Sequence, residues 1–198
     1  MQEINFPVNF KFKISTFAND FTATDARGKT LAYVRQKMFK LKEEIQIFDN
    51  EEKNKVNYTI SADRWLDFSA AYAFYDRDKN EFGKIVRKGW RSLWKAEYTI
   101  IDQHQKEQYK IQEESAWVRF LDSLLGEIPI LGFFTGYLFN PTYILSDLNS
   151  KPIVTLKKLP SFTGRNFELS KVGELDSDDD DRIMLGFMMM ILLERRRG

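Results

Sequence analysis

Cysteine is absent from the 198 residues of this chain, and histidine occurs once, as His104. Without cysteine, disulfide bonds, thiolate metal sites and thiol catalysis are excluded. A Ser-His-Asp arrangement would have to use His104, which lies in the polar stretch from Asp102 to Lys106 and is more typical of an exposed turn. The ten glycines are scattered and form no phosphate-binding loop. We therefore predict no catalytic residues and a protein that is not an enzyme.

The sequence also lacks an excess of charge of either sign. Lysine and arginine number 30 and aspartate and glutamate 29, for a net charge of +1. This balance predicts no overall attraction to nucleic acid, so a charged partner must be recognised by a local patch. Residues 1–7 contain neither a basic segment nor a long apolar run, which predicts no signal peptide. We expect a cytoplasmic protein, since the absence of cysteine also suits a reducing compartment.

Hydrophobic residues are abundant, at 43% of the chain with 17 phenylalanines, which is enough for a packed core. The length suits a single domain spanning residues 1–198. Short segments in which apolar and polar residues alternate predict β-strands. These segments are 10–14, 21–24, 30–37, 44–48, 56–60, 70–75, 83–86, 96–101, 108–112, 143–145, 153–156 and 166–169. About twelve strands are many for one open sheet, so they favour a mainly β fold closed into a mostly antiparallel barrel.

Turn signals follow several of these strands, and each contains an aspartate. They begin at Asp25, Asp49, Asp76, Asp102 and Asp147. Aspartate accepts hydrogen bonds from its own backbone in tight turns, so the pattern predicts a meander of hairpins. The alternative, a metal site, is disfavoured because dispersed turn carboxylates do not converge on one ion.

A segment from Glu113 to Pro141 interrupts the strand pattern. Its first part, Ser115 to Gly126, has apolar residues at helical spacing and predicts a short helix. Its second part, Ile128 to Phe139, is apolar but is broken by proline and glycine, which excludes a regular membrane-spanning helix. Candidate residues for contact with a partner are Ile130, Leu131, Phe133, Phe134, Tyr137 and Phe139. These residues form either an interaction surface or a cover for one end of the barrel.

The C-terminal segment, about 179–196, predicts a helix buried on every side. Five aspartates precede its apolar part and three arginines follow it, which complements the helix dipole. From Ile183 to Leu193 the sequence shows no polar face. This stretch is roughly half of the ~20 residues that cross a bilayer. Because a barrel of about twelve strands is too wide for its own side chains to fill, we predict that this helix occupies the lumen.

Basic and aromatic residues alternate after the middle of the chain. The set consists of Lys84, Arg87, Lys88, Trp90, Arg91, Trp94 and Lys95. Cations with indole rings suit an anionic lipid headgroup at a membrane interface, and they suit single-stranded nucleic acid as well. The alternative is a solvated hairpin whose tryptophans pack inward.

Residues 21–37 and 41–49 follow the order strand, D-x-x-G turn, strand, basic residue, strand and aspartate. This order, with the acidic stretch before the apolar C-terminal segment, resembles the tubby C-terminal-like superfamily and its LURP-one-related and phospholipid scramblase branches. The resemblance implies a twelve-stranded barrel around a hydrophobic helix, with basic residues on the outer wall that bind phosphoinositide headgroups. It also implies a weak Ca²⁺ candidate at Asp176, Asp178 and Asp180, and the alternative is that these carboxylates cap the helix. The segment 113–141 departs from the family pattern.

Three functions remain open at this point. The leading prediction is a non-enzymatic barrel, peripheral at the membrane, that binds phospholipid and needs no cofactor apart from the Ca²⁺ candidate. The first alternative is a soluble scaffold or regulatory protein that binds another protein through residues 128–139. The second is an enzyme with a small ligand in the barrel mouth, which an open cavity with convergent polar groups would favour.

Overall fold

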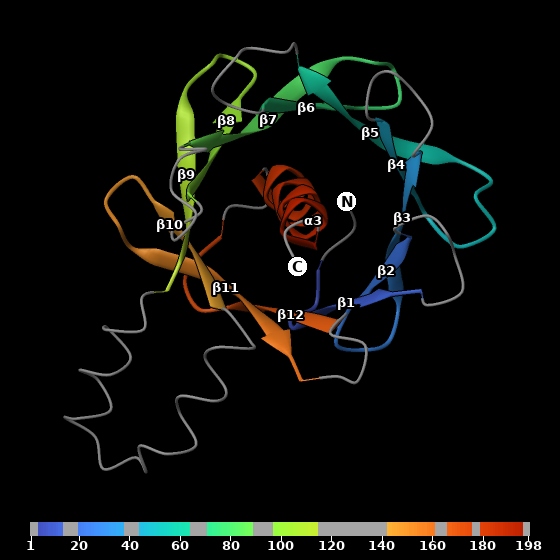
Figure 1. The fold of residues 1–198 in the computed structure, drawn as a ribbon, viewed down its shortest axis with the longest axis horizontal. Helices are drawn as coiled ribbons and strands as arrows, with labels where there is room; N and C mark the ends of the chain where they lie inside the picture. Colours follow the sequence, from blue (N-terminus) through green and yellow to red (C-terminus); the bar gives the residue numbers. More distant parts are fainter. Residues whose placement is uncertain are drawn as a thin grey trace.

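The computed structural model describes residues 4–13, 20–37, 44–63, 71–88, 97–114, 142–160, 166–175 and 179–195. These ranges form twelve strands and one helix, α3, at the centre of the ring of strands (Figure 1). The elements are β1 (Val8–Phe12), β2 (Phe21–Thr24), β3 (Thr30–Lys37), β4 (Glu44–Phe48), β5 (Val56–Asp63), β6 (Ala71–Tyr75), β7 (Glu81–Lys88), β8 (Glu97–Asp102), β9 (Glu107–Glu113), β10 (Thr142–Asp147), β11 (Pro152–Leu159), β12 (Asn166–Lys171) and α3 (Asp180–Arg195).

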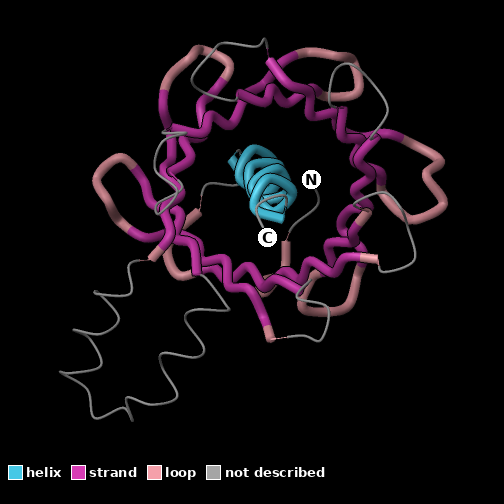
Figure 2. The backbone as a smooth tube through the Cα atoms, in the orientation of Figure 1, coloured by secondary structure: helices cyan, strands magenta, loops and turns pink. Residues whose placement is uncertain are grey.

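The strands form a closed barrel in which each strand pairs antiparallel with its neighbours in the sequence. The first strand closes the ring: Val8 of β1 pairs with Leu169 of β12 on one side, and Asn9 pairs with Thr24 of β2 on the other. Figure 2 shows the resulting ring of strands around the helix. The predicted fold class is confirmed, and each of the twelve predicted segments overlaps one strand. The predicted helix within 113–141 lies outside the described residues.

Alternation along the strands separates the inside of the barrel from the outside. In β1, Val8, Phe10 and Phe12 are buried, whereas Asn9 and Lys11 between them are not. Successive side chains of a strand point to opposite faces of the sheet, so the apolar set faces the lumen. The core is therefore a ring of inward side chains packed around the helix, and the outer wall carries the polar set.

Helix α3 fills the lumen, as predicted. Every residue from Ile183 to Leu192 is buried, and the helix packs against β6, β7 and β8. Gly186 permits its close approach to the wall, because a Cβ atom there would lie 2.8 Å from Cδ1 of Ile100. Within the described ranges, no helix combines the length and the apolar character needed to cross a bilayer.

Five hairpin turns share one construction. They follow β2, β4, β6, β8 and β10, and because the strands alternate in direction, all five turns lie at the same end of the barrel. In the β6–β7 turn, Oδ1 of Asp76 accepts hydrogen bonds from the backbone N–H groups of Asp78 and Asn80. Asp25, Asp102 and Asp147 accept the equivalent pairs of bonds. The residue three positions further on has a positive φ in each turn: Gly28, Lys53, Lys79, Gln105 and Ser150. A strand register shift beside each turn marks a β-bulge.

The predicted turn aspartates are correct at four of the five positions. In the β4–β5 turn the side chain that accepts the backbone bond is that of Asn50, through Glu52 N–H, and not that of Asp49. Asparagine also accepts such bonds, so the next residue replaces the expected one. With this correction, the turns are 25 residues apart from Asp25 to Asn50 and 26 apart from Asn50 to Asp76 and from Asp76 to Asp102.

Candidate functional site

The two members of the predicted basic set whose side chains the structure describes, Lys84 and Arg87, occupy opposite faces of β7. Gly83 and Ile85 face the lumen, since a Cβ at Gly83 would lie 2.8 Å from Cδ of Arg182 and Ile85 packs near Gly186. The register between β7 and β8 has no shift, and Arg87 pairs with the inward residue Tyr98. Arg87 therefore occupies an inward position, and its Nε is buried without a hydrogen-bond partner. Lys84 occupies an outward position between Gly83 and Ile85 and is half-buried.

The other predicted site residues are placed less fully. Lys88 is the last residue of β7, and Trp90, Arg91, Trp94 and Lys95 lie outside the described residues. So do the apolar candidates Ile130, Leu131, Phe133, Phe134, Tyr137 and Phe139. Of the Ca²⁺ candidates, Asp180 lies in the first turn of α3, and Asp176 and Asp178 are not described. No group of three or more potential metal ligands gathers in the part of the chain that the structure describes.

Tyrosine hydroxyls of the wall hold the first turn of α3. Tyr58 of β5 donates to Oδ2 of Asp181, and Tyr109 of β9 donates to Oδ2 of Asp179. Asp179 also forms an ion pair with Arg182, whose guanidinium donates to Oε1 of Gln103 at 3.0 Å. Burial, and then the hydrogen bond to Asp181, raise the pKa of Tyr58 well above its ordinary value, so it remains a donor.

The other end of α3 is held in the same way. Tyr98 of β8 and Tyr143 of β10 donate to the two carboxylate oxygens of Glu194, at 2.5 and 3.2 Å. Burial, and then the charges of Glu194 and Glu113, raise the pKa of Tyr143. A carboxylate near a helix C-terminus is unfavourable for the helix dipole, and these two donors offset that cost. The sequence signal for these residues is weak: they are tyrosines at inward strand positions.

Three of the turn aspartates, Asp25, Asp76 and Asp102, accept backbone hydrogen bonds that lower their pKa values. Bonds from Asn80, both backbone and side chain, hold the pKa of Asp76 below its ordinary value. The Lys106 N–H does the same for Asp102, against the opposing effect of burial. For Asp25, burial acts upward, but bonds from Lys29, Asn5 and Arg27 together lower its pKa. These carboxylates cap turns and do not converge on one another.

His104 lies exposed in the β8–β9 turn, as predicted from the sequence. Its ring nitrogen lies 3.4 Å from the side-chain nitrogen of Gln103. Its backbone N–H donates to the turn aspartate Asp102. The position of this residue is therefore explained by the turn itself.

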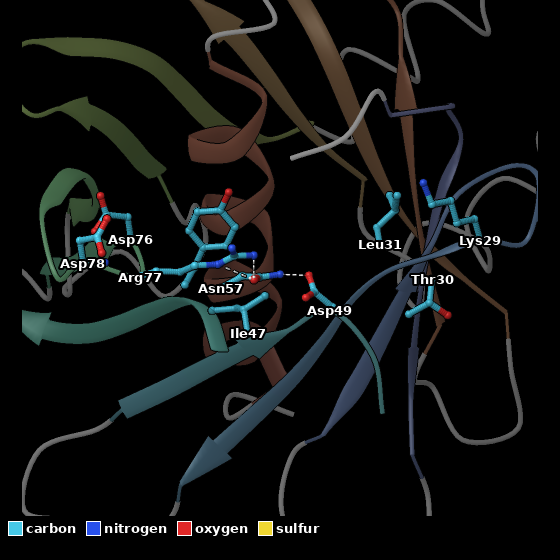
Figure 3. Close-up of a pocket in the computed structure, with 10 residues that line it drawn as sticks. Lys29, Thr30, Leu31, Ile47, Asp49, Asn57, Asp76, Arg77 and Asp78 are labelled. Atoms are coloured by element: carbon cyan, nitrogen blue, oxygen red, sulfur yellow. Dashed lines mark hydrogen bonds between the residues drawn. The ribbon is translucent and has the colours of Figure 1, made fainter. Parts of the chain in front are cut away.

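A cavity of about 580 Å³ opens at the end of the barrel where these turns lie (Figure 3). Its walls are the start of β3, the ends of β4 and β5 that flank the Asn50 turn, and the β6–β7 turn. Across it runs a chain of hydrogen bonds. Arg77 donates from Nε to Oδ1 of Asn57 at 2.9 Å and from Nη2 to the same oxygen, and Asn57 donates to Oδ1 of Asp49. Sequence reasoning missed this group because its members come from separate strands and turns.

Comparison of the chain with protein-family models, with curated proteins and with solved structures gave no match. The likeness to the tubby C-terminal-like superfamily therefore stays a prediction. The class of protein that the fold defines is a closed antiparallel β-barrel with a hydrophobic C-terminal helix in its lumen.

Proposed function

We propose that this protein is a non-enzymatic barrel that binds anionic phospholipid at a membrane surface, as the tubby-like resemblance implies. It would act as a peripheral protein on the cytoplasmic side. The observation that carries the proposal is the filled lumen. Because α3 is buried from Ile183 to Leu192, recognition of a large surface falls to the outer wall or the mouth. Lys84, at an outward position of β7, is the described member of the predicted basic set that the outer wall presents.

Electrostatics gives the expected size of the effect. A lysine near an anionic membrane contributes about 1 kcal/mol of binding free energy. Lys84 and Lys88, the two lysines of the predicted set in β7, should therefore together increase the partition coefficient about 30-fold. The chain carries a net charge of only +1, so binding must depend on local lysines and not on overall attraction.

Co-sedimentation with vesicles tests the proposal. We expect the protein to bind vesicles containing anionic phospholipid more tightly than vesicles of phosphatidylcholine alone, with an affinity that falls as salt rises. The double variant Lys84→Gln/Lys88→Gln should bind about 30-fold more weakly. The matched control is Lys157→Gln/Lys171→Gln, which removes two exposed lysines from β11 and β12, at a distance around the barrel from β7. Equal binding to both kinds of vesicle, or equal losses in the β7 double variant and the control, would contradict the proposal.

A further inference from the structure

The cavity at the barrel mouth has the size of a small-molecule site. Its volume of about 580 Å³ lies within the range of about 300–1,000 Å³ that is usual for ligand pockets. The ring of Tyr58 and the aliphatic side chains of Ile47 and Leu31 form the apolar part of its lining. Ile47 is buried and Tyr58 is fixed through its hydroxyl to Asp181 of α3. The apolar part of the lining is therefore anchored to the core.

Arg77 and Lys29 are the cationic residues that line the cavity, and a neutral partner orients Arg77. Its Nε and Nη2 both donate to the amide oxygen of Asn57. An amide fixes the direction of the guanidinium but does not neutralise its charge, and Nη1 takes no part in this contact. Asn57 is itself held by Asp49. The result is an arginine positioned in advance for an anionic group.

Of the two carboxylates that the β6–β7 turn contributes to the cavity, one caps the turn and the other does not. Asp76 is committed to the turn through both carboxylate oxygens, which accept from Asp78, Asn80 and the Asn80 side chain. Asp78 differs, because it gives only its backbone N–H to the turn and its carboxylate takes no part in the turn's bonds. Figure 3 shows Asp76 and Asp78 together on one side of Asn57, and Lys29 on the opposite side. Charges of both signs thus line one cavity.

We propose that this cavity binds a small zwitterion in which an ammonium group is joined to a carboxylate or a phosphate. A purely anionic ligand would be opposed by Asp49 and Asp78, and a purely cationic ligand by Arg77 and Lys29. A zwitterion pairs its anion with Arg77 and its ammonium with Asp78, and it places its carbon atoms against Tyr58. This chemistry occurs both in soluble amino compounds and in phospholipid headgroups. The proposal stands independently of the lysines on the outer wall.

Titration calorimetry on the full chain, without vesicles, is the test. The probe is O-phosphoethanolamine, with inorganic phosphate and ethanolamine as its two halves. We expect saturable binding of phosphoethanolamine at least about tenfold tighter than that of either half, since each half meets an opposing charge. Arg77→Gln and Asp78→Asn should each weaken binding about tenfold. Arg27→Gln, which changes an exposed turn arginine outside the cavity, should leave it unchanged.

Competition distinguishes the two sources of the ligand. If soluble phosphoethanolamine displaces the protein from vesicles containing phosphatidylethanolamine, the site takes a lipid headgroup; if it binds without displacing, the site takes a soluble compound. Both results support the zwitterion site. Absence of saturable heat, phosphate binding as tight as phosphoethanolamine binding, or full affinity in folded Arg77→Gln would overturn it. Melting curves of the variants show that they are folded.

Discussion

The lumen and the mouth of this barrel differ in the side chains that line them, which are apolar in the lumen and largely charged or polar at the mouth. The lumen holds α3, whose residues from Ile183 to Leu192 are all buried among inward strand residues. The mouth holds a cavity lined by charged side chains of both signs, above a few apolar side chains that contact the core. Packing a lumen completely gives stability and leaves no room for a ligand. Leaving the mouth open costs little, because its turns are supported by their own hydrogen bonds.

The largest expected effect comes from charging the lumen. Leu185 is fully buried, so Leu185→Asp places an unpaired carboxylate in the core and should cost roughly 4 kcal/mol or more. That is a large part of the about 5–15 kcal/mol that holds a domain together. We expect the variant to be unfolded or to lose most of its cooperative transition in urea. Leu185→Met is the control, and it should retain the transition with a loss below about 1.5 kcal/mol.

A second test enlarges the side chain at Gly186, where α3 lies close to Ile100 of β8. The atom nearest to a Cβ there is the flexible end of the Ile100 side chain, which can shift. Gly186→Ala should therefore stay within about 1 kcal/mol of the parent, because better helix propensity offsets the crowding. Gly186→Leu should cost about 3 kcal/mol, since a larger side chain has no space between α3 and β8. Equal free energies of unfolding for both variants would show that the helix does not lie against β8.

The period-two strands and the all-apolar helix could be predicted from the sequence, because each pattern reports burial directly. The pairing of Tyr58 with Asp181 could not, since it joins residues 123 positions apart through closure of the barrel. The sequence could also have shown that Lys84 and Arg87 do not share one surface, because residues three apart on a strand face opposite sides of the sheet. The mouth cavity depends on which turns become neighbours in space, and local sequence does not determine that.

A smaller effect is expected at the tyrosines that hold α3. Tyr98→Phe removes one of the two tyrosine donors to Glu194 without changing the shape of the core. Hydrogen bonds to a charged acceptor contribute about 1.5–3 kcal/mol, so we expect a loss in this range by urea denaturation. Tyr143→Phe, which removes the longer of these two bonds to Glu194, at 3.2 Å, is the comparison and should lose less. A loss in Tyr98→Phe below about 0.5 kcal/mol would argue against a structural role for this contact.

The smallest expected effect is a pH dependence of stability that arises from the turn aspartates at the mouth. The folded-state pKa values of Asp25, Asp76 and Asp102 lie below the ordinary value of 3.8. Their contribution to stability is therefore complete above that value and is lost as the pH falls through the lowered pKa values. Melting temperatures should fall between about pH 4.5 and pH 2.5. The triple variant with asparagine at these positions keeps an acceptor oxygen but does not titrate, and its melting temperature should fall less steeply over this interval.

The absence of cysteine makes one measurement on the buried helix especially direct. Met189, in the middle of α3, is fully buried, whereas Lys157 on β11 is exposed. In single-cysteine variants, we predict that Met189→Cys reacts with a thiol reagent at least about 1,000-fold more slowly than Lys157→Cys, and only as fast as the barrel opens. Reaction of the two folded variants at rates within about tenfold of each other would contradict a helix enclosed by the barrel.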